Sequence, residues 1–176
     1  MTGYPAPVTA ATKAVFASGT WNASPAAVDA WMRNPPLALL QQTVAQSIPS
    51  GNSTIAISFD TTIRDDYNGH KMTAKGDAWT APAPGVYHVC GMTNLAWTGA
   101  GGAIVNPSLV TNNSQWAQLW IPASPSPVRF QHSLSALIPM AAGDYVQLQL
   151  YQTSGAAQST GFVTTGCRLS VRWIGL

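Results

Sequence analysis

The chain of 176 residues is long enough for one sizeable domain, and its 46% hydrophobic content predicts that it folds. Only 8% of the residues are charged, whereas a typical soluble domain has roughly 25%. The net charge is +2 and the basic residues form no cluster, so we expect neither nucleic acid nor a membrane as a partner. So few charges cannot cover a monomer, which favours polar uncharged faces and burial of surface between subunits.

The N-terminal segment lacks the basic and apolar regions of a secretory signal, so we expect assembly in a cytoplasm. The two cysteines do not resemble the disulfide framework of a small secreted domain. Cys167 alternates in phase with Leu169 and Val171, which predicts a small buried side chain. A single bridge between Cys90 and Cys167 stays open, because it depends on whether their strands are neighbours.

Residues 1–42 differ from the rest of the chain and are predicted to form an extended arm with one short helix. Residues 1–20 are rich in Ala, Thr and Pro and show no clear periodicity. Ser24 can cap a helix that begins at Pro25 and stops before Pro35. The helix is too short to be stable alone, so it packs either on its own domain or on another protein. The candidate particle anchor is its apolar face and the residues that follow: Val28, Trp31, Met32, Leu37, Leu39 and Leu40.

From residue 43 onward, short apolar segments alternate with turn residues, which is typical of an all-β protein. Asn68-Gly69 predicts a hairpin turn within residues 65–70. About seven or eight short strands joined by turns predict a β-sandwich or jelly roll. The clearest strands are predicted over residues 54–59, 86–97, 116–121, 128–138, 142–151 and 167–173.

Residues 142–151 show the most regular alternation in the chain. Val146, Leu148 and Leu150 mark a core-facing side. Amide and phenol groups on the other side offer hydrogen bonds without the desolvation cost of a charge. We therefore expect the interface between subunits to use Tyr145, Gln147, Gln149 and Tyr151.

Two segments resemble the C1q/TNF-like jelly rolls. One runs from Ala81 to Val89 (APAPGVYHV), and the other runs from Leu137 to Val146 (LIPMAAGDYV). Other segments are similar to the C1q-like modules of tailed-bacteriophage virion proteins, particularly those of actinobacteriophages. These are Thr43 to Pro49, Tyr151 to Gly155, and the lead-in Trp31-Met32-Arg33-Asn34. The similarity spans residues 43–176, although residues 106–126 match no motif of the family.

The resemblance implies an all-β, C1q/TNF-like jelly roll over residues 43–176 that forms a homotrimer. It also implies a non-enzymatic structural role on a bacteriophage virion, with the N-terminal arm as the particle anchor. The protein would then be a capsid decoration or minor capsid protein, with the major capsid protein as its partner. The alternative is a minor tail or tail-tip protein that binds a host-surface glycan or protein receptor. The short arm favours the capsid surface.

Candidate chemical sites are few. Asp65, Asp66 and Asn68 have the spacing of a calcium loop, but no Glu completes a ligand set and an ordinary turn explains them. Two Cys and three dispersed His give no zinc spacing. No nucleophile elbow accompanies His70 and His88, which argues against a serine hydrolase. Few carboxylates are present to form the pair that a glycoside hydrolase needs. We therefore expect no catalytic residues, no metal and no cofactor.

Tryptophan is abundant, with seven residues in the chain. Most of them lie in or beside predicted strands, where packing in a core or an interface is the default role. An exposed Trp can instead stack on a sugar ring, which keeps glycan binding open. The residues concerned are Trp79, Trp97, Trp116, Trp120 and Trp173.

Overall fold

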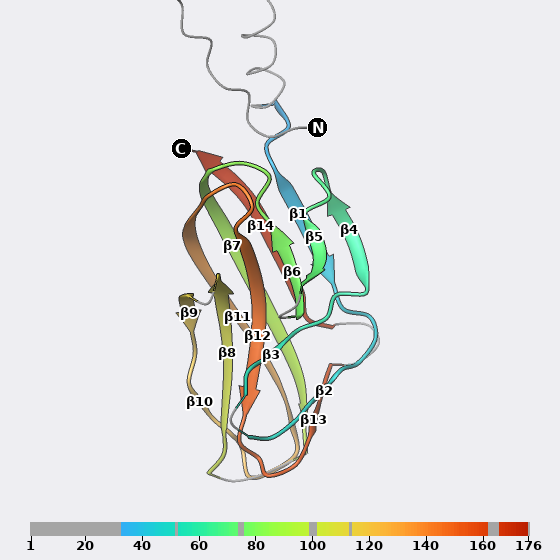
Figure 1. Cartoon of the computed structure of the whole chain (residues 1–176). Helices are drawn as coiled ribbons and strands as arrows, with labels where there is room; N and C mark the ends of the chain where they lie inside the picture. The colour runs from blue at the N-terminus through green and yellow to red at the C-terminus, as the bar shows by residue number, and fades with distance from the viewer. Residues whose placement is uncertain are drawn as a thin grey trace, which may run out of the picture.

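The computed structural model describes residues 33–51, 53–73, 76–98, 102–112, 114–161 and 166–175. They form two antiparallel sheets of seven strands each, packed face to face (Figure 1). The predicted all-β sandwich is therefore confirmed. The predicted helix lies almost wholly outside the described residues, and so do the anchor candidates Val28, Trp31 and Met32.

The first sheet is organised around its longest strands, β7 (Gly85–Trp97) and β11 (Val128–Met140), which pair along their whole lengths. On its other side β7 pairs first with β14 (Arg168–Gly175) and then with β13 (Gln158–Thr160). The sheet continues outward from these two strands through β1 (Leu37–Gln41), β2 (Ser47–Ile48) and β4 (Thr61–Asp65). Among the described strands, β11 forms one edge of this sheet, and β2 and β4 lie at the other edge.

The second sheet has β8 (Ile104–Thr111) and β12 (Tyr145–Gln152) at its centre. The free side of β8 pairs with β9 (Ser114–Gln118) and β10 (Ile121–Pro122). The free side of β12 pairs with β6 and β3, and β6 then pairs with β5. These last strands are β3 (Ile55–Ala56), β5 (His70–Thr73) and β6 (Gly76–Thr80).

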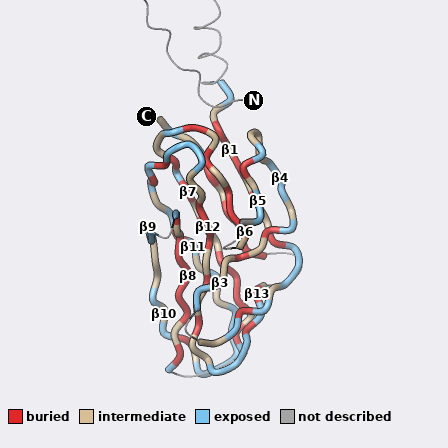
Figure 2. The backbone as a smooth tube through the Cα atoms, viewed as in Figure 1, coloured by how far each residue is buried: buried red, intermediate tan, exposed pale blue. Residues whose placement is uncertain are grey.

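The core fills the space between the sheets and follows the alternation of the strands. Val89 and Leu95 of β7 and Leu148 of β12 are fully or almost fully buried, as the sequence pattern predicts. The Trp79 and Tyr87 rings meet edge to face, with centroids 5.5 Å apart. Figure 2 shows the buried backbone concentrated on the central strands of both sheets.

The predicted hairpin at residues 65–70 is wrong, although the turn itself is present. The chain does turn here, with Asn68 at φ 53°, but β4 belongs to the first sheet and β5 to the second. The turn thus carries the chain across the sandwich. Gly69 permits a close crossing, because a Cβ at this position would lie 2.5 Å from the Thr80 carbonyl oxygen.

The start of the jelly roll also needs correction. The predicted boundary at residue 43 cuts off β1, which pairs with both β14 and β4 inside the first sheet. Leu40 is fully buried in the core of the sandwich. It therefore packs within its own domain and is not free to anchor the chain to another protein.

The cysteines are free thiols on opposite sides of the first sheet. Cys167 is buried in the core, as predicted, whereas Cys90 is half-buried on the outer face. Burial raises the pKa of the Cys167 thiol to about 11, against the opposing effect of backbone hydrogen bonds. Within the described ranges there is no cluster of three potential metal ligands, and no helix long and apolar enough to cross a membrane.

Candidate functional site: the outer face of the first sheet

The first sheet presents a broad outer face that the described residues leave partly uncovered. Side chains that alternate with the core residues of β7 point to this side of the sheet. We define the outer face by the residues that β7, β11, β14 and β1 contribute: Val86, His88, Cys90, Met92, Ser133, Ser135, Leu137, Pro139, Arg168, Ser170, Arg172, Leu37, Leu39 and Gln41.

Strand register arranges these side chains in rows across the sheet. One row contains Leu137, His88, Arg172 and Leu37. The next row contains Ser135, Cys90, Ser170 and Leu39. The second row therefore holds only apolar, hydroxyl and thiol groups, whereas the first row also carries the imidazole of His88 and the guanidinium of Arg172.

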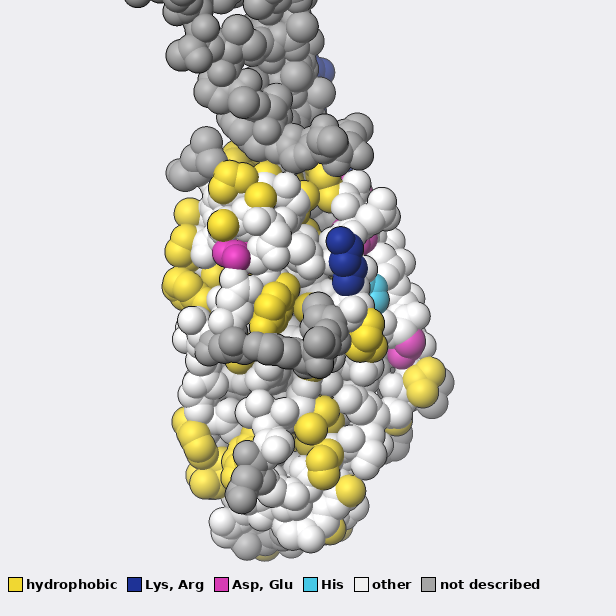
Figure 3. Space-filling view, in the orientation of Figure 1, with side chains coloured by type: hydrophobic (Ala, Val, Ile, Leu, Met, Phe, Trp, Pro, Cys, Tyr) yellow, Lys and Arg dark blue, Asp and Glu magenta, His cyan; other side chains and the backbone are white. Residues whose placement is uncertain are grey.

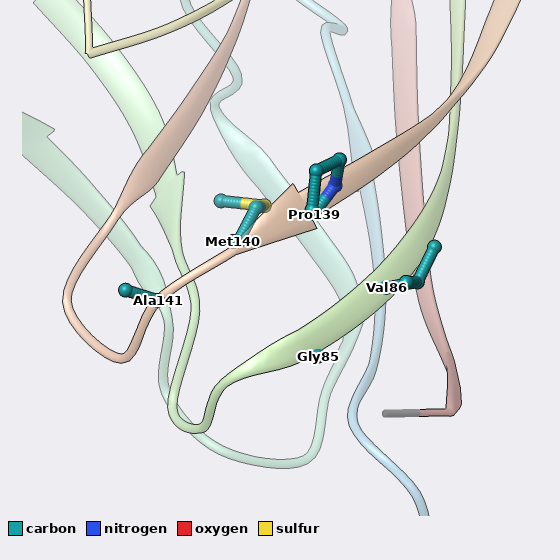
Figure 4. A pocket seen from close by; sticks show the side chains of 5 residues that line it. All are labelled: Gly85, Val86, Pro139, Met140 and Ala141. Carbon is teal, nitrogen blue, oxygen red and sulfur yellow. The ribbon is translucent and has the colours of Figure 1, made fainter.

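One leucine at the edge of the outer face, Leu137, is mostly exposed to solvent. Leu137 of β11 is 59% accessible, although Ile138 and Met140 of the same strand are buried in the core. A hollow of about 460 Å³ continues the apolar surface toward the end of β7 and β11 (Figure 4). It is lined by Gly85, Val86, Pro139, Met140 and Ala141. Such an apolar area on a protein surface is typical of an interaction site.

The charges on the outer face all have one sign. Arg168 and Arg172 of β14 are exposed, and none of the residues that define the face is a carboxylate. Arginine is the basic residue most enriched in protein interfaces, because its guanidinium is weakly hydrated and can stack and donate several hydrogen bonds. Charged groups are also sparse on the opposite side of the sandwich, where Figure 3 looks onto the second sheet.

Two groupings on or near this sheet have chemically reactive side chains. The Cys90 sulfur lies 3.5 Å from His88 Nε2 on the open outer face. At the far edge, His70 contacts the Thr62 hydroxyl and the Asp77 carboxylate, at 2.9 Å and 2.8 Å. The order hydroxyl, imidazole and carboxylate matches that of a catalytic triad. However, Asp77 also accepts a hydrogen bond from Phe59 N, so this chain of bonds joins strand ends of both sheets.

The predicted site residues fall in three different places. Leu37 and Leu39 lie half-buried on the outer face of the first sheet, opposite in direction to Leu40. The predicted subunit interface lies on the outer face of the second sheet: Tyr145, Gln147, Gln149 and Tyr151. Gln147 is only 1% exposed there, because its amide donates to the Asp77 carbonyl and accepts from the Gln149 amide. Its side chain is therefore occupied within its own subunit.

Alternation could have identified part of the outer face from the sequence. Residues that alternate with Tyr87, Val89 and Leu95 must point away from the core, and this rule selects His88, Cys90 and Met92. The contribution of β11 was harder to find, because Ser133 and Ser135 lack any apolar signal. Only the pairing of β11 with β7 places them beside Met92 and Cys90.

No family model matches the sequence, and no curated protein is significantly similar to it. Solved structures are similar in fold. The globular domain of zebrafish complement 1qA has a TM-score of 0.57 at 14% identity, covering 79% of this chain and 97% of that domain. A TNF protein, Eiger from S. frugiperda, has a TM-score of 0.55 at 12% identity, covering 80% and 93%. The chain thus has the C1q/TNF-like jelly-roll fold.

Proposed function

We propose that this chain is a non-enzymatic structural module that associates with copies of itself through the outer face of the first sheet. The observation that carries the proposal is the exposure of Leu137 within an apolar, carboxylate-free surface. A monomer with only 8% charged residues gains solubility by covering such a surface. The face spans four adjacent strands, an extent that suits a stable interface of ~800 Å² per partner.

The assembly that we propose is a homotrimer. The C1q/TNF-like fold supports this number by analogy with the trimers of that class. A threefold arrangement also suits a sandwich with one open face and a long edge strand beside it, since each copy can place an edge against the face of its neighbour. The fold likeness supports the stoichiometry, whereas the exposed apolar residues support association itself.

The trimer is further proposed to sit on a bacteriophage virion, with the capsid surface preferred and a tail position as the alternative. The support is the resemblance of Trp31 to Asn34, Thr43 to Pro49 and Tyr151 to Gly155 to phage virion modules. Residues 1–32 precede every described strand and would supply the anchor to the major capsid protein or a tail protein. Three such anchors on one trimer raise the effective concentration of each of them.

A non-enzymatic role is consistent with the structural use of the Thr62, His70 and Asp77 groups. Asp77 is 3% exposed and holds Phe59 N at 2.6 Å as well as His70. These bonds fix the ends of strands that come from both sheets. The clefts at Gly85 and at Trp120 are lined by other residues.

The mass of the full chain in solution tests self-association, measured by light scattering at concentrations up to about 100 μM to include micromolar affinities. We expect the mass of three chains for the wild type and dissociation for Leu137→Asp, because a buried unpaired charge is costly. Met72→Asp is the matched control, since Met72 is 71% exposed on β5 of the second sheet. A monomeric wild type, or equal dissociation of both variants, overturns the proposed interface.

Deletion of residues 1–32 tests the anchor separately, because it leaves every described strand in place. The truncated protein should still have the mass of three of its own, shorter chains but lose co-sedimentation with phage particles. Normal particle binding by the truncated trimer would contradict the assignment of the anchor to this segment.

A further inference from the structure

The second sheet carries a small cleft on its outer face, on the opposite side of the sandwich from the proposed interface. Its volume is about 290 Å³, at the lower end of the range for small-ligand sites. All of its lining residues are polar or aromatic and none is charged: Thr54, Asn106, Gln115, Gln118, Trp120 and Tyr151.

Strand register explains how distant parts of the sequence form this cleft. Tyr151 of β12 pairs with Asn106 of β8, and both side chains alternate with core residues, so they share the outer face. Pairing of β3 with β12 brings Thr54 alongside. The link between β9 and β10 supplies Trp120, and a 3.1 Å hydrogen bond from Leu119 N to the Pro107 carbonyl holds this link against β8.

Asn106 is the polar group that the fold leaves unsatisfied at the base of the cleft. The residue is 3% exposed, and its Nδ2 has no hydrogen-bond partner among the described protein atoms. The neighbouring Ser108 Oγ on the same face of β8 is also buried without a partner. Leaving a buried donor unmatched costs about 1–3 kcal/mol, so such a group is a natural contact for a ligand oxygen.

Trp120 supplies the second half of a recognition site. Its side chain is 62% exposed at the rim of the cleft, an unusual position for a large aromatic ring. A pyranose ring has one face of C–H groups that stacks on an indole, and a rim of hydroxyl groups that both donate and accept hydrogen bonds. Amide side chains such as those of Gln115 and Gln118 match that rim, since each offers a carbonyl oxygen and an NH₂ group.

We propose that this cleft binds a neutral saccharide, with the sugar ring stacked on Trp120 and a sugar oxygen accepting from Asn106 Nδ2. The absence of charge among the lining residues favours a neutral sugar over a sialylated or phosphorylated one. The size of the cleft fits one ring, and affinity for a single ring is expected to be near millimolar. The site does not depend on self-association, because it uses the other sheet.

The position of the cleft suits recognition of an external glycan. Strand β10 and the last residues of β12 lie at the end of the sandwich away from residues 33–37 and from the C-terminal end of β14 (Figure 1). A molecule attached through residues 1–32 would therefore present the cleft away from its attachment point. Multiple copies in one assembly would convert weak single-site binding into useful avidity.

The test uses the full chain with methyl glycosides of glucose, galactose, mannose and N-acetylglucosamine, and with sialyllactose as the acidic probe. Ligand-observed saturation-transfer NMR and tryptophan fluorescence report binding at up to about 10 mM, which covers millimolar dissociation constants. We expect at least one neutral glycoside to bind and Trp120→Ala to weaken it at least tenfold. Trp116→Ala is the matched control, because Trp116 is also exposed on this sheet but does not line the cleft.

Asn106→Leu separates a ligand contact from a structural role. Removing an unpartnered donor leaves no broken bond, so the melting temperature should not fall while sugar binding is lost. If Asn106→Leu does not fold, the Trp120→Ala variant alone tests the proposal, since the Trp120 side chain is mostly exposed. Absence of binding for every neutral glycoside, tighter binding of sialyllactose, or equal binding by Trp120→Ala and wild type would each overturn the proposal.

Discussion

His70 Nε2 lies 2.8 Å from the carboxylate of Asp77, and this pair connects β5 and β6 at the edge of the second sheet. The other imidazole nitrogen is 2.9 Å from the Thr62 hydroxyl of β4, in the first sheet. Asp77 of β6 and His70 of β5 belong to the second sheet. The chain crosses from the first sheet to the second just before His70. Backbone hydrogen bonds between the described strands do not connect the two sheets, so the side-chain bonds of His70 hold this crossing in place.

Replacing Asp77 with alanine should destabilise the fold by about 2–4 kcal/mol, because the Phe59 amide and His70 lose a buried acceptor. Urea unfolding followed by tryptophan fluorescence measures the change. Asp66→Ala is the control, since Asp66 pairs with exposed Arg64 and should cost at most about 1 kcal/mol. Equal effects of the two substitutions would contradict the role assigned to Asp77.

Asp60 should make stability depend on pH in the acidic range. Burial acts to raise its pKa, but the Thr43 hydroxyl and the Thr43 and Val44 amides donate to the carboxylate and lower the pKa to about 2, from 3.8. Because the folded pKa lies below the unfolded one, the stabilisation is present above 3.8 and is lost as the pH falls toward 2.

The measurement is the difference in unfolding free energy between wild type and Asp60→Asn at pH 6 and at about pH 2.5. At the higher pH, wild type should be more stable by about 1 kcal/mol, a value reduced for solvent screening of an exposed group. At the lower pH, just above the folded pKa, this difference should fall to roughly a third. A constant difference across this range would show that the charge of Asp60 contributes nothing.

Gly85 should resist substitution, because it lies against the last strand. Its φ is 148°, and a Cβ would lie 2.1 Å from Trp173 Nε1 and 2.6 Å from the Gly175 carbonyl oxygen. Gly85→Ala is expected to cost about 2–4 kcal/mol from strain and clash together. Gly155→Ala is the control, since Gly155 has φ 81° but open space around it, and should cost about 1 kcal/mol. Thermal unfolding of both variants checks the ranking, and a Gly85 variant as stable as the Gly155 variant would refute the clash.

The two thiols should report separately on assembly and on folding. Cys90 lies on the proposed interface, so Leu137→Asp should increase its rate of labelling by a thiol reagent at least tenfold over wild type. Cys167 should stay unlabelled in both proteins until they unfold, because burial removes access and raises its pKa to about 11. Fast labelling of Cys90 in wild type would place it outside any interface. Mass spectrometry of modified peptides separates the two sites.

Strands with strict alternation could be predicted from the sequence. The segments 86–97 and 142–151 contain most of β7 and most of β12. In β12, Val146, Leu148 and Leu150 lie at every second position and are buried, as are Val89 and Leu95 in one alternating set of β7. Strand β8 escaped prediction, because Asn106, Pro107 and Ser108 interrupt its apolar pattern while lying at the centre of a sheet. Which strand pairs with which is harder to predict than where a strand lies. Asn68-Gly69 indicates a turn, but it does not reveal that the strands on either side of the turn belong to different sheets.

The candidate surfaces depend on pairings that the sequence does not contain. The abundance of Trp indicates a possible sugar contact, yet nothing in the local sequence distinguishes Trp120 from Trp116. The cleft forms only when β8, β12 and β3 pair in register and bring Asn106, Tyr151 and Thr54 together. The uncharged face of β12 was predicted to bind other subunits, whereas register places Tyr151 in that cleft and Gln147 in contacts within its own sheet.

Strand β11 has a consequence for how the chain stays soluble. Among described strands it pairs with β7 alone, so thirteen residues offer every second backbone N–H and C=O to any strand that approaches its free edge. Within β11, only the charge of Arg129 and the missing N–H of Pro139 oppose repeated edge-to-edge pairing between chains. A newly made chain would therefore be least prone to aggregate if it associated quickly with other copies of itself. Assembly would then limit aggregation in place of the surface charge that the chain lacks.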